Sequence, residues 1–196
     1  MSYSITALTD DYYEGTSCLI NKLNIKNEEQ LSKIEASITL AKTAELERNP
    51  ICNSFDFEHY KQIHRYLFED LYEWAGCIRT VDISKKGTVF TLTENIEAVA
   101  NACFNRLKKY NYFKNLNFDD FIENIVDFYC STNMLHPFRE GNGRTQRIFI
   151  AQLVRFCGYD INFSEIDTDE LMVATIHSAN GITDYLTEIF KEHIKH

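Results

Sequence analysis

Apolar residues recur every three or four positions along most of this chain, which is the spacing that places them on one face of an α-helix. Two segments, residues 118–135 and 144–158, are apolar around most of their circumference, as is typical of helices buried on all sides. We therefore expect an all-helical domain with these two segments at its centre. The pattern predicts helices over residues 27–47, 55–76, 93–110, 118–135, 144–158 and 183–196.

The ends of these segments carry residue types that start and stop helices. Asn27 is placed to cap the first helix, and Pro50 lies beyond its end. Gly76 is expected to end the second helix and Thr93 to cap the third. Only two prolines and seven glycines interrupt the 196 residues, and this scarcity of helix breakers also favours helices.

One segment, Ile78 to Leu92, has a different pattern. It reads IRTVDISKKGTVFTL, is rich in β-branched residues and has a Lys-Lys-Gly turn at its centre, which predicts a β-hairpin. A two-stranded hairpin is only marginally stable in water on its own. We therefore expect it to pack on the helices or to offer its edge to another chain. The alternative is a rigid surface hairpin that binds no partner.

Composition narrows the class of protein. A length of 196 residues with 44% hydrophobic residues predicts one folded domain, and a net charge of −9 argues against general nucleic-acid binding. No apolar run approaches the ~18 residues of a membrane helix. The N-terminus lacks a basic, signal-like segment. The six cysteines are scattered singly, so we expect free, mostly buried thiols, no zinc site and a cytoplasmic protein.

The most unusual stretch for an acidic protein runs from His136 to Arg147 and reads HPFREGNGRTQR, with three arginines and one acid. Pro137 disfavours the helical conformation of the residue before it, so we expect His136 in a loop. Gly141 and Gly143 flank the start of the next helix, where glycines permit positive φ and let backbone N–H groups converge on an anion.

Two arginines in this stretch, Arg144 and Arg147, lie three residues apart and should emerge from one side of the helix. Positive charge in a first turn is unfavourable by roughly 0.3–1 kcal/mol per residue, and a polyphosphate would relieve it. Glu140 is placed to hold Mg²⁺ and His136 to act as a general base. Each feature alone also fits an ordinary surface, and together they indicate a phosphate or nucleotide site without naming the reaction.

The stretch matches H-x-F-x-[D/E]-G-N-G-R-x-x-R, the signature of the Fic (filamentation induced by cAMP) family, at every specified position. Upstream, QIHRYLFEDLYEWAGCIRTVDISKKGTVF resembles the helix and flap hairpin of that family. GTSCLINKLNIKN and TAELERNPI resemble the N-terminal region of bacterial toxin-type members. The resemblance implies one Fic domain over residues 1–196, all-α with one hairpin flap. Its parts would be a helical extension over 1–50, the flap over 78–92 and the motif loop and helix over 136–157.

The resemblance also implies an activity, the transfer of AMP from ATP to a Ser, Thr or Tyr hydroxyl of a target protein, with release of pyrophosphate. His136 would deprotonate the hydroxyl and Glu140 would bind Mg²⁺. The flap would pair with an extended target segment by strand addition. The docking residues implied are Ile83, Ser84, Lys85, Lys86, Gly87, Thr88 and Val89.

The remaining motif residues would hold the nucleotide. Asn142 and the backbone of Gly141 and Gly143 would contact the α- and β-phosphates, and Arg144 and Arg147 the β- and γ-phosphates. Two alternatives stay open: a phosphotransferase, although the phosphorylating branch of the family departs from G-N-G, and a non-catalytic nucleotide-binding module.

The sequence also bears on regulation. Many Fic proteins carry an inhibitory helix, [S/T]-x-x-x-E-[G/N], whose glutamate pairs with the second motif arginine. The nearest match here, Thr43 to Glu47, is followed by Arg48 and fails the pattern. The resemblance therefore implies a small antitoxin that supplies the glutamate to Arg147 in trans. A degenerate Thr43–Glu47 helix acting in cis, or no inhibition, are the alternatives.

Overall fold

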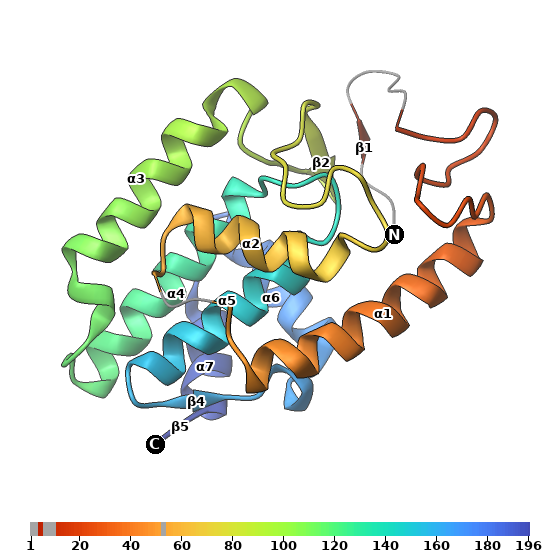
Figure 1. Ribbon diagram of the computed structural model, residues 1–196. Helices are drawn as coiled ribbons and strands as arrows, with labels where there is room; N and C mark the ends of the chain where they lie inside the picture. Colours follow the sequence, from red (N-terminus) through yellow and green to blue (C-terminus); the bar gives the residue numbers. More distant parts are fainter. Residues whose placement is uncertain (1–3, 6–10, 52–53) are drawn as a thin grey trace.

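The computed structural model describes residues 4–5, 11–51 and 54–196, and α-helices account for most of this part of the chain (Figure 1). Two antiparallel sheets of very short strands complete it. The helices are α1 (Glu28–Arg48), α2 (Phe57–Phe68), α3 (Ile96–Lys109), α4 (Phe118–Leu135), α5 (Asn142–Phe156), α6 (Thr168–Ala179) and α7 (Asp184–His193).

The two helices predicted to be central are central. α5 packs against α1, α2 and α4, while α4 also packs against α3, α6 and α7. Phe149 of α5 is fully buried and contacts the rings of Phe55, Tyr60, Phe104 and Phe128 at centroid distances of 5.4–5.9 Å. Apolar burial of this kind is the main favourable contribution to folding, so the buried pair α4–α5 anchors the domain.

Several predicted helix ends are confirmed. The Asn27 side chain caps α1 by accepting a hydrogen bond from the Gln30 N–H at 2.9 Å, and α4 spans the predicted residues. The second helix was predicted too long, because α2 ends at Phe68 and the chain then turns through Leu71 into the core. Gly76 lies back against α2, where an added Cβ would be 2.8 Å from the Cβ of Arg65.

Two other predictions at helix starts need correction. Thr93 does not cap α3: it begins a 3₁₀ turn, Thr93–Asn95, whose first N–H donates to the Asp82 carboxylate at 2.8 Å. Helix α6 was not predicted, because it buries few apolar residues and its hydrophobic pattern is weak. Its capping residue Asp167 accepts from two backbone N–H groups and is the sequence signal that could have located it.

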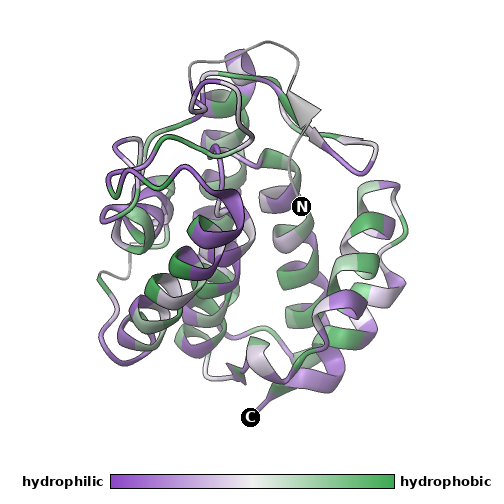
Figure 2. Cartoon of the chain, turned by 90° about the vertical axis from the view of Figure 1, so that its right-hand side faces the viewer, coloured by the Kyte–Doolittle hydropathy of each residue, from purple (hydrophilic) through white to green (hydrophobic). Residues whose placement is uncertain are grey.

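The predicted hairpin is confirmed in a shorter form. β2 (Ile83–Lys85) and β3 (Thr88–Val89) pair through a turn in which Lys86 and Gly87 both have positive φ. A third strand that was not predicted, β1 (Ser4–Ile5), pairs with the other edge of β2. Figure 2 shows this hairpin at the top of the molecule, reaching over the helices.

A second small sheet joins β4 (Asp160–Ile161) to β5 (Ile194–Lys195). The cysteines of the described part are free, with Cys103 buried and Cys77 exposed, so the expectation of mostly buried thiols holds only in part. Cys52 lies outside the described residues. No helix in residues 11–51 or 54–196 is long and apolar enough to cross a membrane.

Candidate active site

A cavity of about 750 Å³ lies between α1, the hairpin, the α4–α5 connection and α6. Four of the residues predicted for the site line it: His136, Gly143, Arg144 and Arg147. Lys85, Lys86 and Thr88 of the hairpin line it as well. The cavity wall does not include the other predicted residues, which are Ile83, Ser84, Gly87, Val89, Glu140, Gly141 and Asn142.

His136 follows the last residue of α4 and has left the helical conformation, as the following Pro137 predicts. Its backbone is left-handed, with φ 42° and ψ 59°, a region that non-glycine residues rarely adopt. Such conformations cost energy and persist where the surrounding structure holds them. The His136 N–H still donates to the Thr132 carbonyl at 3.3 Å, so the residue is tied to the end of α4.

The His136 ring is held in one tautomer. It stacks on Phe90 with a centroid distance of 3.7 Å, and its Nδ1 lies 3.0 Å from the Asn133 carbonyl oxygen. Because a carbonyl oxygen only accepts hydrogen bonds, Nδ1 carries the proton and Nε2 the lone pair. Burial lowers the pKa of His136 to about 3, and the positive charges of Lys85 and Arg79 act in the same direction.

Arg79 at the base of the hairpin holds the loop that carries His136. Its Nε donates to the His136 carbonyl at 2.9 Å, and its backbone N–H donates to the Pro137 carbonyl at 2.9 Å. The other guanidinium nitrogens donate to the carbonyls of Val81 and Thr91 on the two sides of the hairpin. One buried side chain thus fixes the hairpin relative to His136, a role that the sequence analysis missed.

Asn142 closes the motif loop on itself. Its Oδ1 accepts from the Phe138 N–H at 2.8 Å, and its Nδ2 donates to the Phe138 carbonyl at 2.8 Å. Phe138 is fully buried and stacks on His64 at a centroid distance of 3.8 Å. The Asn142 side chain is therefore occupied within the loop, and what it can offer a phosphate is its backbone N–H.

His64 of α2 joins two turns and was also missed by the sequence analysis. Its Nε2–H donates to the Glu140 carbonyl at 3.0 Å, and its Nδ1 accepts from the Gly76 N–H at 2.8 Å. Burial lowers the pKa of His64 to about 3. Since a proton on Nδ1 would face the Gly76 N–H, the ring stays neutral and keeps both contacts.

The two glycines of the loop serve different needs. Gly141 precedes α5 with φ 77°, and an added Cβ would lie 2.2 Å from Cζ of Phe68, so both its conformation and its surroundings require glycine. Gly143 lies inside the first turn of α5, where an added Cβ would be 3.2 Å from Nη1 of Arg147. The missing side chain at Gly143 thus leaves room for a guanidinium.

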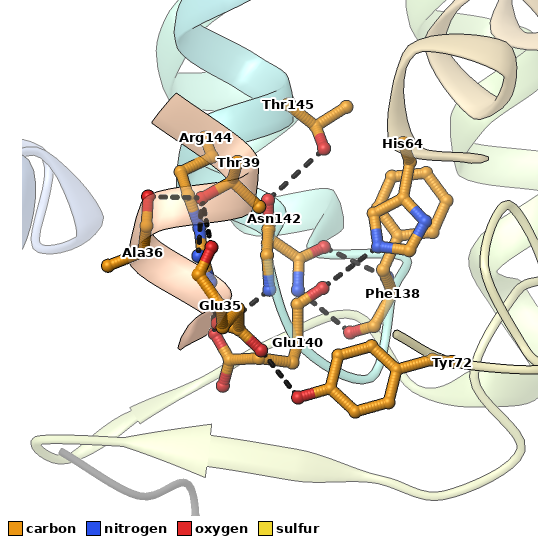
Figure 3. A network of polar contacts seen from close by, with 11 residues as sticks. Glu35, Ala36, Thr39, His64, Tyr72, Phe138, Glu140, Asn142, Arg144 and Thr145 are labelled. Carbon is orange, nitrogen blue, oxygen red and sulfur yellow. Dashed lines mark hydrogen bonds and ion pairs between the residues drawn. The ribbon is translucent and has the colours of Figure 1, made fainter. Parts of the chain in front are cut away.

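The first motif arginine is engaged by its own chain, as Figure 3 shows. Nη2 of Arg144 lies 2.5 Å from Oε1 of Glu35 and 3.7 Å from Oε1 of Glu140. Nη1 donates to Thr39 Oγ1 at 3.3 Å, and the guanidinium lies 4.8 Å from the centre of the Phe68 ring. Helix α1 therefore supplies a counter-charge that the sequence analysis did not identify.

The second motif arginine is in a different state. In the part of the chain whose side chains are described, no carboxylate lies within 4.0 Å of a nitrogen of Arg147. Glu47, the nearest match to an inhibitory glutamate, lines the same cavity but forms no such ion pair. Burial lowers the pKa of Arg147, and the positive charge of Arg144 adds to this. Arg147 is thus a cation without an acidic partner among the described residues.

Arg139, the third arginine of the stretch, belongs to the scaffold. Its Nε lies 3.0 Å from the Asp11 carboxylate, and Nη2 donates to the Tyr12 hydroxyl at 2.6 Å. The guanidinium also lies over the Tyr12 ring. The pairing ties the N-terminal segment to the motif loop and leaves Arg139 out of the cavity.

Known proteins share the sequence features of this site. The family model described as Fic/DOC family matches residues 54–154. The chain belongs to the Fic/DOC family. It is 36% identical to the protein adenylyltransferase VbhT of Bartonella schoenbuchensis over 91% of this chain. It is 33% identical to the probable protein adenylyltransferase Fic of Escherichia coli over 92%. The chain spans 37% of the length of VbhT and 89% of the Escherichia coli protein.

Solved Fic structures have the same fold. BepC from Bartonella tribocorum, with bound AMPPNP, superposes with a TM-score of 0.88 at 26% identity, covering 94% of this chain and 95% of BepC. The Fic domain of a Bep effector from Bartonella quintana, with bound ADP, gives a TM-score of 0.89 at 27% identity, covering 94% of each chain. The predicted all-helical Fic fold with a hairpin flap is confirmed.

Proposed function

We propose that this Fic protein is a protein adenylyltransferase that transfers AMP from ATP to a Ser, Thr or Tyr hydroxyl of a target protein. The observation that carries the proposal is that one cavity is lined by a neutral His136 and by Arg147, a cation with no acidic partner among the described residues. The names of the relatives support it, as do the AMPPNP and ADP bound to two similar structures.

The cavity has the size and polarity for a nucleotide. Its volume of about 750 Å³ falls within the range of small-molecule sites. Its lining includes Arg144, Arg147 and the start of α5, where backbone N–H groups attract phosphate. It also includes apolar side chains, among them Ile166, Leu171 and Met172. We infer that the triphosphate binds at the arginines and the purine base against the apolar side chains.

The transfer step follows from the tautomer of His136. Nε2 accepts the proton of the target hydroxyl while the hydroxyl oxygen attacks the α-phosphorus. The bond from the α-phosphorus to the bridging oxygen breaks, and pyrophosphate leaves. Arg144 and Arg147 neutralise negative charge on the β- and γ-phosphates. A pKa of about 3 makes a weak base, and the negative charge of bound triphosphate raises it.

Glu140 fits the role of a Mg²⁺ ligand. Its Oε1 accepts the Gly141 N–H at 2.9 Å, and the side chain keeps 27% of its surface exposed. Within the described residues no cluster of three or more His, Cys, Asp or Glu side chains forms, so a metal ion would depend on Glu140 and phosphate oxygens. Mg²⁺ is commonly bound in this way. Bound there, Mg²⁺ would neutralise charge on the phosphate oxygens.

Target docking on the flap involves a defined edge. β2 is the central strand, paired with β1 on one side and β3 on the other, so the edge that the hairpin itself offers for strand addition is the outer edge of β3. Val89 of β3 is 64% exposed, and the next residue, Phe90, stacks on His136. An extended target segment paired with Thr88–Val89 would therefore run next to the base.

We infer further that a small antitoxin inhibits the protein in trans. The lack of an acidic partner for Arg147 in the described part of the chain supports this. Leu40 of α1 lines the cavity and is 72% exposed, which offers an apolar contact for an added helix. A glutamate on that helix would pair with Arg147 where the γ-phosphate otherwise binds.

The mass added to a target tests the proposed reaction. Incubation of purified protein, ATP and Mg²⁺ with bacterial lysate should add about 329 Da to a target, whereas phosphotransfer adds about 80 Da. The matched variant His136→Ala should bind ATP and add no mass. Nucleotide binding with no adduct from the unaltered protein would identify a non-catalytic module instead, and an adduct formed by His136→Ala would remove His136 from its role.

A further inference from the structure

The guanidinium of Arg144 lies between two carboxylates that come from different parts of the chain. Glu35 of α1 is the closer at 2.5 Å, and Glu140 of the motif loop is 3.7 Å away, both measured from Nη2 (Figure 3). Glu140 is the proposed Mg²⁺ ligand. The position of Arg144 therefore bears on whether Glu140 is available to the metal ion.

The buried carboxylate of Glu35 has polar and charged partners. It is buried, with 9% of its surface exposed, and the Tyr72 hydroxyl donates to its Oε2. Thr39, one turn further along α1, donates to the Glu35 carbonyl at 2.7 Å and accepts from Arg144. A buried carboxylate is costly unless it is paired and hydrogen-bonded, and here Arg144 provides the opposite charge and the Tyr72 hydroxyl the hydrogen bond.

We propose that Glu35 is a positioning residue that holds Arg144 at the wall of the cavity and so keeps Glu140 available for Mg²⁺. The proposal rests on the proposed function, because it takes Glu140 as the metal ligand. Without the Glu35 charge, the nearest carboxylate to Arg144 is Glu140, four residues before it in the chain. Arginine and metal would then compete for one carboxylate.

The test measures ATP binding by calorimetry over a series of Mg²⁺ concentrations. Glu35→Gln should raise the Mg²⁺ concentration for half-maximal ATP affinity by about threefold to tenfold, which lies within the range for residues of one ion-pair network. Saturating Mg²⁺ should restore both affinity and AMP transfer. The matched control Tyr72→Phe removes the other hydrogen bond of the same carboxylate and should leave the Mg²⁺ dependence unchanged.

A shorter acid separates position from charge. Glu35→Asp keeps the negative charge but shortens the side chain by one methylene, so we expect a Mg²⁺ shift between those of the unaltered protein and Glu35→Gln. An unshifted Glu35→Asp beside a shifted Glu35→Gln would mean that charge alone matters and would overturn the proposal, as would the absence of any shift. Binding is measured without transfer, so normal binding with no AMP adduct would count against the proposed function alone.

Discussion

Arg144 and Arg147 lie three residues apart on α5 and line the same cavity, but their surroundings differ. Arg144 is engaged by Glu35 and Thr39 of α1 and lies over a phenylalanine ring. Arg147 has no acidic partner in the described part of the chain. The first arginine is thus held by the folded scaffold as well as lining the cavity, whereas the second lines the cavity without an acidic partner among the described residues and is the one that we propose for a ligand. Mutation of the two arginines should therefore affect stability differently, although both belong to one motif.

The largest effect should come from removing Arg147. We expect Arg147→Ala to lower the rate of AMP transfer by about 10²–10³-fold, because it deletes a charge that stabilises the leaving pyrophosphate. The free energy of unfolding should stay close to that of the unaltered protein, since no buried acid loses its partner. Radiolabel transfer from ATP and urea unfolding measure the two quantities. Marked destabilisation would show that Arg147 has a structural partner after all.

The paired arginine should behave in the opposite way with respect to stability. Arg144→Gln leaves the buried Glu35 without its counter-charge, and we expect the free energy of unfolding to fall by roughly 3 kcal/mol, as for a buried ion pair that loses one member. Urea unfolding of this variant beside Arg147→Ala checks the contrast directly. Equal stability of the two variants would contradict the distinction between the arginines.

The difference between the two arginines could not be predicted from the sequence, for a physical reason. Spacing on one helix correctly places Arg144 and Arg147 at one cavity, because helical geometry is local. The partner of Arg144 lies 109 residues earlier in the chain, and nothing local marks Glu35 as buried. Arg139 illustrates the same limit, since its long-range pairing with Asp11, which holds it in the scaffold, has no local signal in the sequence.

Other features of the site also differ in whether neighbouring residues or long-range packing determine them. The loop conformation at His136 and the hairpin turn at Lys86-Gly87 follow from neighbouring residues and were predicted. The contact from His64 to the Glu140 carbonyl depends on how α2 packs and was not. The family signature assigns Asn142 to the phosphates, whereas the structure commits its side chain to Phe138. A motif thus names the residues of a site more reliably than the atoms that they use.

The two buried neutral histidines, His64 and His136, should make stability depend on pH. Unfolded histidines bind a proton near pH 6.5, while His64 and His136 in the folded chain bind one only near pH 3. The unfolded state therefore binds more protons between these values, so stability should fall as pH drops below 6.5, by about 1.4 kcal/mol per pH unit for each histidine. Urea unfolding at pH 7 and pH 5.5 measures this. His136→Ala should lower the slope by one histidine's share, and an unchanged slope would contradict its low pKa.

The smallest expected effect comes from a change that crowds the guanidinium of Arg147. In Gly143→Ala the new Cβ would lie 3.2 Å from Nη1 of Arg147, so the guanidinium must move by a few tenths of an ångström. We expect KM for ATP to rise about twofold to fivefold, within the range of weak coupling between contacting residues. Stability should hold or rise by up to about 1 kcal/mol, because alanine favours the helix more than glycine does. A larger fall in kcat than rise in KM would show that Gly143 contributes its backbone to the transferred phosphate, beyond making room for Arg147.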